Sequence, residues 1–472
     1  MYYISTRGDD GQPKSFEEVL LAGMASDGGL YVPETWPEID ISVLKGKSYS
    51  DVAFAIMYPF VEGSIPEDVF KDIIQKTYAG TVFRDSAIAP LHHLEGYGDG
   101  SIHIMELFHG PTLAFKDVAL QLLGHLFDYT LKTQKKRVTI VGATSGDTGS
   151  AAIEGCKSCQ QADIFILHPS GRVSDVQRRQ MTTVKASNVF NIALDGTFDD
   201  CQNIVKALFA DKDFCSTLQL SAVNSINWAR IMAQIVYYFT SALALGAPER
   251  PVSFVVPTGN FGNVFAAYSA KKMGLPIKTL GIASNQNDIL TRFFENGVMQ
   301  IDEPYKTLSP SMDIQISSNF ERYLFDLFGR DPMRLGAVMR SFKECGHFAV
   351  SPEHLENARA IFQASRSDDV LTLSMIKEVY EACGYCLDPH TAVGMPQAKD
   401  IAQNSDEDHP VVLLATAHPA KFPDAIERAI GMRPDLPEHI ADLYERQEFM
   451  SGQPNDLNTI KAYIEKHSRV VI

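Results

Sequence analysis

The sequence predicts an α/β protein with two open parallel-sheet lobes and a small α+β domain at its N-terminus. Two observations predict this fold. Short apolar runs typical of buried strands alternate with helical patterns over residues 137–209, and a second series of the same kind begins at Val252. The chain of 472 residues is also long enough for roughly three domain-sized units. Because strands alternate with helices, the sheets should be parallel with right-handed crossovers.

The first predicted domain covers residues 1–95. This segment mixes short strand-like and helical patterns, and prolines divide it at short intervals. Proline interrupts both helices and central strands, so the segment is predicted to be a separate N-terminal domain of short strands and helices.

The second predicted domain covers residues 96–250. We expect strands at residues 137–141, 163–167 and 189–194, and helices after Gly149 and at residues 173–184 and 198–209. This order is typical of a lobe built on a parallel sheet.

The third predicted domain covers residues 251–472. After the strand at Val252 we expect strands at residues 277–282 and 411–415, a helix that starts near Phe422, and a helical tail at the C-terminus. Residues 319–380 are predicted to be a mainly helical insertion. A ligand should bind between the two lobes, at the carboxyl ends of their strands.

Lys116 stands out among the lysines because of its surroundings. It lies between Phe115 and Asp117 in the segment FHGPTLAFKD, after a turn that contains proline and directly before a helical apolar run. Burial disfavours an ammonium group and lowers the pKa of a lysine, and Schiff-base chemistry requires the unprotonated amine. A single lysine near a helix start is more often a solvated surface residue, so this candidate depends on the motifs that accompany it.

Two glycine-rich turns follow, each between a predicted strand and a predicted helix. They are TSGDTG at residues 144–149 and PTGNFGN at residues 257–263. Glycine lets backbone amides approach a ligand, and the first amides of the next helix have no intrahelical partner, so each turn is a candidate anion site. Neither turn matches a P-loop, and the second lacks the third glycine of a dinucleotide-binding motif.

Together these segments resemble the threonine synthase family. The resemblance is carried by FHGPTLAFKD, both glycine-rich turns, YYISTRG at residues 2–8, ASDGGLYVPE at 25–34, LDPHTAVG at 387–394 and ATAHPAKFP at 415–423. The tryptophan-synthase-like superfamily shares the lysine and the glycine loop, whereas STRG and DGGLYVPE look like threonine synthase in particular. The long N-terminal segment is more similar to fungal and enterobacterial members than to the shorter plant members.

The resemblance implies a fold, a cofactor and a reaction. The fold would be that of the tryptophan-synthase-like pyridoxal-phosphate enzymes, and the cofactor would be pyridoxal 5'-phosphate. The reaction would convert O-phosphohomoserine and water to threonine and phosphate, which makes the enzyme a lyase of amino-acid biosynthesis.

The resemblance also implies roles at the cofactor. Lys116 would hold the cofactor as a Schiff base and, once released, would move protons at the α and β carbons of the substrate. Thr416 would place its hydroxyl against the pyridine nitrogen, although a threonine that ends a buried strand is also a common strand former. The following loop residues would bind the cofactor's phosphate through backbone amides: Gly259, Asn260, Phe261, Gly262 and Asn263.

The first glycine-rich turn is predicted to bind the substrate. Thr144, Ser145 and Thr148 would offer hydroxyls and turn amides to its carboxylate or phosphate. Asp147 does not suit an anion site, and we expect it to brace the turn instead.

The substrate's phosphate also needs cations. Arg230 is the leading candidate, with Lys185 and Arg178 as others, and a surface salt bridge is an equally common role for any one of them. His109 precedes the Lys116 turn and could orient the substrate, although a structural role is more common for a single histidine.

Composition restricts the partners. A net charge of −16 at pH 7 argues against nucleic acid and against an anionic membrane surface. There is no apolar run of membrane-spanning length and no secretory pattern at the N-terminus, so we expect a cytoplasmic protein, either a monomer or a homodimer.

The seven cysteines include two C-x-x-C pairs, at residues 156–159 and 383–386. The pairs are far apart in the sequence, so packed free thiols are expected rather than a metal site. In the second pair Gly384 is placed like a helix C-cap, which does not fit a thioredoxin-type motif.

Three alternative functions stay open. Another pyridoxal-phosphate lyase, such as serine/threonine dehydratase or cysteine synthase, would share the lysine and the glycine loop. A catalytically silent relative would bind a phosphorylated ligand or a protein, although the presence of Lys116 and Thr416 argues against it. A nicotinamide-dependent oxidoreductase would need the missing glycine.

Overall fold

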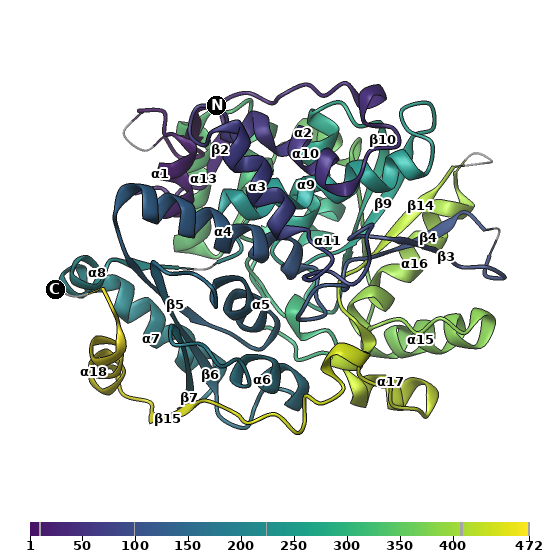
Figure 1. Ribbon diagram of the computed structural model, residues 1–472. Helices are drawn as coiled ribbons and strands as arrows, with labels where there is room; N and C mark the ends of the chain where they lie inside the picture. Colours follow the sequence, from purple (N-terminus) through teal and green to yellow (C-terminus); the bar gives the residue numbers. More distant parts are fainter. Residues whose placement is uncertain (9–10, 99, 223, 406–408, 471–472) are drawn as a thin grey trace.

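The computed structural model has two lobes that lie side by side, each built around an open sheet (Figure 1). It describes residues 1–8, 11–98, 100–222, 224–405 and 409–470. The predicted α/β class with two parallel-sheet lobes is confirmed.

The first lobe contains a five-stranded sheet in the order β15-β7-β6-β5-β8, in which every pair of neighbours is parallel. Its strands are β5 (Val138–Ala143), β6 (Ala162–Pro169), β7 (Val189–Asp195), β8 (Leu220–Ser221) and β15 (Ser451–Pro454). Three of these strands lie within a residue or two of the bounds that the apolar runs predict.

Helices cover both faces of this sheet. Alternate side chains point to opposite faces, so Ile140 joins the core under α4 and α5 while its neighbour Val141 joins the core under α7, α8 and α18. The helices of this lobe are α4 (Lys116–Gln134), α5 (Asp147–Cys156), α6 (Asp175–Thr182), α7 (Phe198–Ala210), α8 (Lys212–Leu218) and α18 (Leu457–His467).

The second lobe contains a six-stranded sheet in the order β13-β10-β9-β14-β4-β3. Only β3 runs antiparallel to its neighbour. The strands are β3 (Leu91–His93), β4 (Ile102–Glu106), β9 (Val252–Pro257), β10 (Ile277–Ser284), β13 (Phe362–Arg366) and β14 (Val411–Ala415). The bounds of β14 are those predicted from the sequence.

This sheet also separates two cores. Phe254 and Val256 pack against α9 and α10, whereas Val255 faces α15, α16 and α17. The helices are α9 (Trp228–Ala244), α10 (Gly262–Lys272), α11 (Ile289–Asn296), α12 (Phe320–Leu327), α13 (Pro332–Cys345), α14 (Pro352–Arg359), α15 (Asp369–Cys383), α16 (Pro389–Gln403) and α17 (Pro423–Ile430). Beside them lies a two-stranded antiparallel sheet of β11 (Val298–Gln300) and β12 (His347–Ala349).

The N-terminal segment has no separate core. It contributes β1 (Tyr3–Ser5), β2 (Tyr31–Pro33), α1 (Phe16–Ala22), α2 (Tyr49–Val61) and α3 (Glu67–Thr77). Tyr3 donates a hydrogen bond to the carbonyl oxygen of Phe60 and contacts Trp228 of α9, with ring centroids 6.0 Å apart. The segment is therefore part of the same hydrophobic core as α4, α9 and α10.

The sheets do not follow the predicted domain limits at residues 95 and 250. β3 and β4 precede the first lobe in the sequence but pair within the second sheet, because β4 lies beside β14. Conversely, the C-terminal tail leaves the second lobe after α17 and adds β15 and α18 to the first (Figure 1).

The prediction for residues 319–380 needs one correction. α12 to α15 make this segment mainly helical, but it also contains the strands β12 and β13. β13 is the edge strand of the six-stranded sheet. The periodicity of so short a strand is easily hidden between helices.

Two of the cysteine predictions, the free thiols and the helix end at Gly384, agree with the structure. All seven cysteines are free thiols, and Gly384 ends α15 with a left-handed backbone at φ 72°. Among the described residues, no helix combines the length and apolar character needed to cross a membrane.

Candidate active site

The predicted site residues lie at the carboxyl ends of strands, where the two lobes meet. β5 and β9 lead into the two glycine-rich turns, β4 leads toward Lys116, and β14 ends just before Thr416. Two of these segments pair directly, because the backbone N–H of Phe115 donates to the carbonyl oxygen of Thr416 (2.9 Å). This is the position at which open α/β sheets bind ligands.

Lys116 is the first residue of α4 and is buried, with 8% of its surface exposed. Its Nζ atom lies 3.2 Å from Oδ2 of Asp147 and 5.0 Å from the ring centroid of Phe115. Burial lowers the pKa of Lys116 below that of a free lysine, although the nearby Asp147 carboxylate opposes the change. The amine therefore has the depressed pKa that the sequence predicts.

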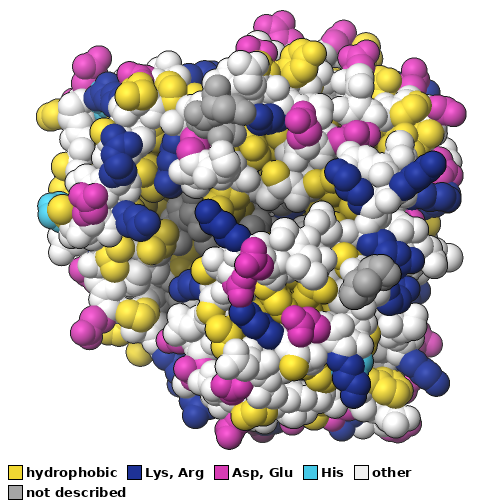
Figure 2. Space-filling view, turned by 90° about the vertical axis from the view of Figure 1, so that its left-hand side faces the viewer, with side chains coloured by type: hydrophobic (Ala, Val, Ile, Leu, Met, Phe, Trp, Pro, Cys, Tyr) yellow, Lys and Arg dark blue, Asp and Glu magenta, His cyan; other side chains and the backbone are white. Residues whose placement is uncertain are grey.

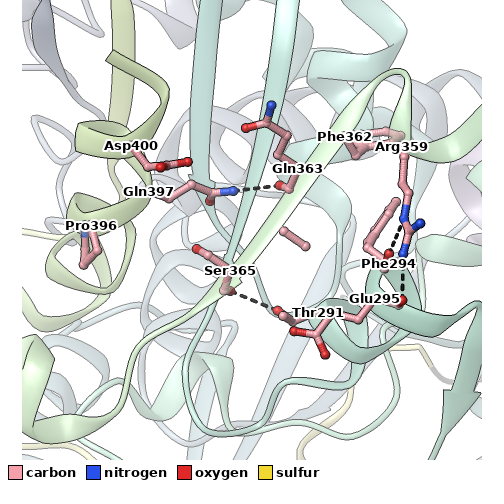
Figure 3. Close-up of a pocket in the computed structure, with 11 residues that line it drawn as sticks. Thr291, Phe294, Glu295, Arg359, Phe362, Gln363, Ser365, Pro396, Gln397 and Asp400 are labelled. Carbon is pink, nitrogen blue, oxygen red and sulfur yellow. Dashed lines mark hydrogen bonds between the residues drawn. The ribbon is translucent and has the colours of Figure 1, made fainter. Parts of the chain in front are cut away.

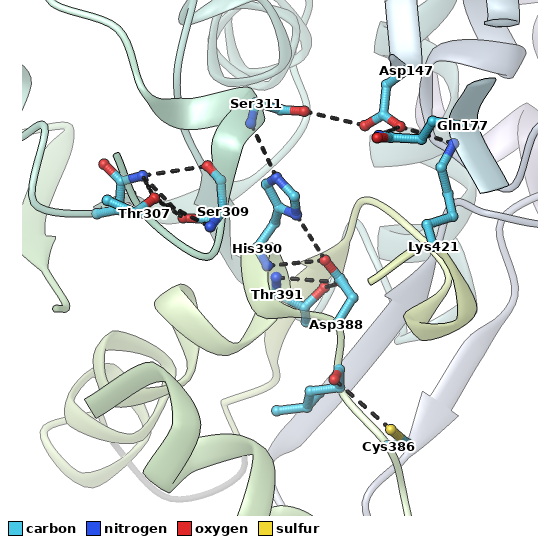
Figure 4. A network of polar contacts seen from close by, with 12 residues as sticks. Asp147, Gln177, Thr307, Ser309, Ser311, Cys386, Asp388, His390, Thr391 and Lys421 are labelled. Carbon is cyan, nitrogen blue, oxygen red and sulfur yellow. Dashed lines mark hydrogen bonds and ion pairs between the residues drawn. The ribbon is translucent and has the colours of Figure 1, made fainter. Parts of the chain in front are cut away.

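Asp147, at the start of α5, is the centre of the polar network (Figure 4). Its Oδ2 atom accepts from Lys116 and from the hydroxyl of Ser311 (3.1 Å), and its Oδ1 atom accepts from Lys421 (2.8 Å) and Gln177 (2.8 Å). Burial alone would raise the pKa of Asp147, but the two lysine charges hold it well below the usual value. Asp147 thus stays ionised and does more than brace its turn.

The TSGDTG turn is held together by Thr144. Its hydroxyl oxygen accepts from the backbone N–H groups of Gly146 (3.0 Å) and Gly149 (2.9 Å). Gly146 has φ 146°, which favours glycine, and α5 begins without a side-chain cap. Ser145 is exposed and Thr148 is half-buried. Ser145 and Thr148 are therefore better placed than Thr144 to present a hydroxyl to a ligand.

The second glycine-rich turn leads into α10. Phe261 adopts a left-handed backbone at φ 60°, and α10 starts at Gly262 without a side-chain cap. The hydroxyls of Tyr237 and Tyr238 both donate to Oδ1 of Asn263. Nδ2 of Asn263 is buried and has no partner among the described residues. Uncapped amides and an unpaired amide donor are what an anion such as phosphate binds.

A second segment covers this turn. The hydroxyl of Ser317 donates to the carbonyl oxygen of Gly259 (2.7 Å), and the backbone N–H of Asn319 donates to that of Asn260 (3.0 Å). A Cβ added at Gly259 would lie 3.0 Å from the carbonyl oxygen of Ser311. The turn is therefore held rigidly and leaves little room for a larger residue.

Arg230 lies in the first turn of α9 and is 3% exposed. Its Nε and Nη1 atoms are buried without a partner among the described residues. Burial lowers the pKa of Arg230 to about 10. A buried guanidinium without a counter-ion is costly, so its presence points to an anionic ligand.

Thr416 directly follows β14 and is 7% exposed. Its backbone is fixed by the bond from Phe115, whereas its hydroxyl has no hydrogen-bond partner within the described part of the chain. The hydroxyl is thus free to bind a ligand atom.

Of the three other predicted candidates, Arg178 and His109 are engaged elsewhere and Lys185 is exposed. Arg178 pairs with Glu448 of the C-terminal tail (2.8 Å). His109 pairs with Glu106 (2.8 Å), which agrees with a structural role.

Lys421, Gln177 and Ser311 contact Asp147 directly but are not among the residues that the sequence predicts for the site. Lys421 lies in the quoted segment ATAHPAKFP, and its apolar neighbours were the available clue. The backbone N–H of Ser311 also donates to His390, whose Nδ1 lies 3.0 Å from Asp388 (Figure 4). Ser311 thereby links α5 of the first lobe to α16 of the second.

These residues fit pyridoxal 5'-phosphate. The site offers a buried amine of depressed pKa at Lys116, an unpaired hydroxyl at Thr416, and an uncapped helix start with the unpaired Asn263 amide for a phosphate. Pyridoxal 5'-phosphate needs an amine, a partner for its ring nitrogen and an anion site, and each of these is present.

Over the face in Figure 2, Lys and Arg side chains are interspersed with Asp and Glu. A groove of about 480 Å³ lies along β13 between α11 and α16 (Figure 3). None of the predicted site residues lines it.

Family models match nearly the whole chain. "Threonine synthase N terminus" matches residues 2–78, "Pyridoxal-phosphate dependent enzyme" matches residues 83–339, and "Threonine synthase, C-terminal" matches residues 391–464.

Individual proteins are similar over 99% of the chain. Threonine synthase of Pseudomonas aeruginosa is 53% identical, with 99% of this chain and 98% of the relative covered. The crystal structure of pyridoxal-phosphate-bound threonine synthase from Brucella melitensis matches with a TM-score of 0.95 at 50% identity, covering 99% and 100% of the two chains. The yeast threonine synthase structure matches with a TM-score of 0.93 at 42% identity, covering 99% and 98%.

Proposed function

The chain belongs to the threonine synthase family of pyridoxal-phosphate-dependent enzymes, and we propose that it converts O-phosphohomoserine and water to L-threonine and inorganic phosphate. This reaction is a γ-elimination of phosphate followed by addition of water at the β carbon, which makes the enzyme a carbon–oxygen lyase acting on phosphates. The observation that carries the proposal is the buried Lys116 amine at the carboxyl ends of the strands, close to unpaired anion-binding groups.

Lys116 is proposed to do the proton chemistry. When bound, pyridoxal 5'-phosphate supplies an electron sink for the charge that develops at the substrate's carbon atoms. Proton removal at Cα and then at Cβ needs one mobile base, and burial lowers the pKa of the Lys116 amine, which shifts it toward its neutral, basic form. Lys116 therefore serves both as the attachment point and as the base.

The remaining residues would bind and orient. Residues 259–263 would hold the cofactor's phosphate at the start of α10, and Thr416 would meet the ring nitrogen. Ser145 and Thr148, with the uncapped amides of α5, would take the substrate's carboxylate, while Arg230 would take its phosphate. We expect the reaction to take place in the cytoplasm, in a monomer or homodimer.

The assay follows both products. Purified protein loaded with cofactor is given O-phosphohomoserine, and threonine and phosphate should appear in equal amounts. Serine and threonine serve as control substrates for a dehydratase. Phosphate release without threonine would indicate an elimination-only lyase, and no reaction by a yellow, loaded protein would favour the silent relative.

A further inference from the structure

Lys421 is a completely buried lysine in a short turn of the second lobe. Its Nζ atom donates to the carbonyl oxygen of Thr112 (2.7 Å) and to Oδ1 of Asp147 (2.8 Å). Removing a lysine from water is expensive, so a fully buried one requires a strong partner or a functional reason.

The contacts of Asp147 suggest that reason. Lys421 and Lys116 bind opposite oxygens of the same carboxylate, at 2.8 and 3.2 Å. Gln177 and Ser311 supply one further donor to each oxygen, so the carboxylate is saturated. Lys421 makes the shorter of the two lysine contacts. The negative charge of Asp147 therefore acts on both lysines and not on Lys116 alone.

We propose that Lys421 is a positioning residue for Lys116: by pairing with Asp147, it prevents that carboxylate from holding the Lys116 amine as an ammonium ion. The inference rests on the proposed function in one respect, namely that Lys116 must act as an uncharged amine. Lys421 itself contacts Thr112 and Asp147 and is not proposed to touch the substrate or the cofactor.

The charges around Lys116 come from three other elements. Asp147 of α5 favours the ammonium form, whereas Lys421 of the turn after β14 and Arg230 of α9 disfavour it. On α4 itself, Asp117 is turned toward Thr112, which donates to it through its backbone N–H (2.8 Å) and its hydroxyl (2.7 Å). Lys421 is thus a cation that directly neutralises the Asp147 carboxylate, which contacts Lys116.

The pKa of Lys116 can be measured directly. Full-length protein freed of cofactor is treated with trace acetic anhydride over a range of pH, and acetylation of Lys116 is followed by peptide mass spectrometry. Lys421→Met should raise the pH midpoint of Lys116 acetylation by about one unit, because the Asp147 carboxylate then acts on Lys116 alone. Lys421→Arg should keep the wild-type midpoint, and Asp147→Asn should lower it.

A purely structural role predicts a different pattern. A lysine that only braces the Thr112 turn would change thermal stability but leave the midpoint of Lys116 unchanged. An equal midpoint in Lys421→Met and wild type, or an equal rise in the Met and Arg variants, would overturn the proposal. If Lys421→Met does not fold, Asp147→Asn decides, and a midpoint that does not fall would also overturn it.

A control variant is Lys461→Met, which removes a lysine paired with Asp211 outside the site and should leave the Lys116 midpoint unchanged. Acetylation reports on the amine itself. The result is therefore independent of whether O-phosphohomoserine is the substrate.

Discussion

The backbone N–H of Phe115 donates to the carbonyl oxygen of Thr416 over 2.9 Å, although about three hundred residues separate them in the sequence. A further bridge joins Ala114 to Ala417. The start of α4 is therefore fixed to the end of β14, and Lys116 keeps a constant relation to Thr416. A group that must contact both residues at once benefits from such preorganisation.

Replacing Lys116 tests the attachment point. Lys116→Ala should lose turnover by more than about a thousandfold, because it removes the amine that both attaches the cofactor and moves protons. Borohydride reduction of the wild-type protein followed by peptide mapping should place the pyridoxyl group on Lys116. Lys132→Ala, on an exposed face of α4, should behave like wild type. A label on another lysine would show that the assignment is wrong.

The phosphate loop is tested at Gly262. A Cβ there would lie 3.3 Å from Nδ2 of Asn319 and 3.5 Å from Cδ1 of Ile231, so Gly262→Val should displace the start of α10. We expect cofactor affinity to fall by roughly tenfold or more, measured by absorbance titration, before folding fails. Gly80→Val is the control, because a Cβ at Gly80 meets nothing within 4 Å. Full occupancy of Gly262→Val at low cofactor concentration would mean that the loop has another purpose.

Thr416 tests the electronic properties of the site. Thr416→Ala should retain some cofactor but slow turnover by roughly ten- to a hundredfold, because the hydroxyl proposed to meet the ring nitrogen is lost. Thr416→Asp should favour a protonated ring and side reactions such as transamination. Thr416→Ser keeps the hydroxyl and should stay close to wild type. Unchanged steady-state rates in Thr416→Ala would remove Thr416 from the proposed site.

The local part of the fold could be predicted from the sequence. The apolar run at residues 411–415 is bounded by Pro410 on one side and by Thr416 on the other, and it forms β14 with those limits. Similarly, the strand–turn–helix pattern around TSGDTG produces β5 and α5. In these cases hydrophobic periodicity and turn chemistry agree.

Long-range pairing could not be predicted in the same way. β4 precedes the first lobe but pairs with β14 of the second, and β15 has the polar sequence SGQP that gives no apolar pattern. Lys421 could not be predicted as a site residue for the same reason: its partner Asp147 lies in the other lobe. A single sequence does not show which distant segments meet in space.

His418 predicts an acid-dependent loss of stability. Burial lowers its pKa to about 4, and its Nδ1 atom accepts from the backbone N–H of Ala420 (3.1 Å). The unfolded chain binds the proton at about pH 6.5, whereas the native state does not until about pH 4. The stabilisation is therefore complete above about pH 6.5 and is lost as the pH falls toward 4.

The measurement for His418 is urea unfolding at pH 7.5 and at pH 5. Wild type should lose roughly 1–2 kcal/mol more than His418→Asn, which keeps a side-chain acceptor but does not titrate. His347→Asn, at an exposed position, is the control and should retain the wild-type dependence. Equal losses in wild type and His418→Asn would show that His418 is not the source.

Replacing Arg230 should have opposite effects on the stability of the ligand-free protein and on catalysis. In the absence of ligand its buried Nε and Nη1 atoms have no partner within the described residues, so Arg230→Met should leave the melting temperature unchanged or raise it. With O-phosphohomoserine, the loss of a charge-assisted contact to phosphate should raise KM by roughly ten- to a hundredfold.

The control for Arg230 is Arg428→Met, which removes an exposed arginine of α17 and should change neither quantity. Inhibition by inorganic phosphate should weaken together with KM in Arg230→Met, because both anions would use the same guanidinium. A fall in cofactor affinity with an unchanged KM would instead assign Arg230 to the cofactor's phosphate. A large loss of melting temperature without either effect would mean that the guanidinium supports the fold, and the cation for the substrate would then have to be sought elsewhere in the site.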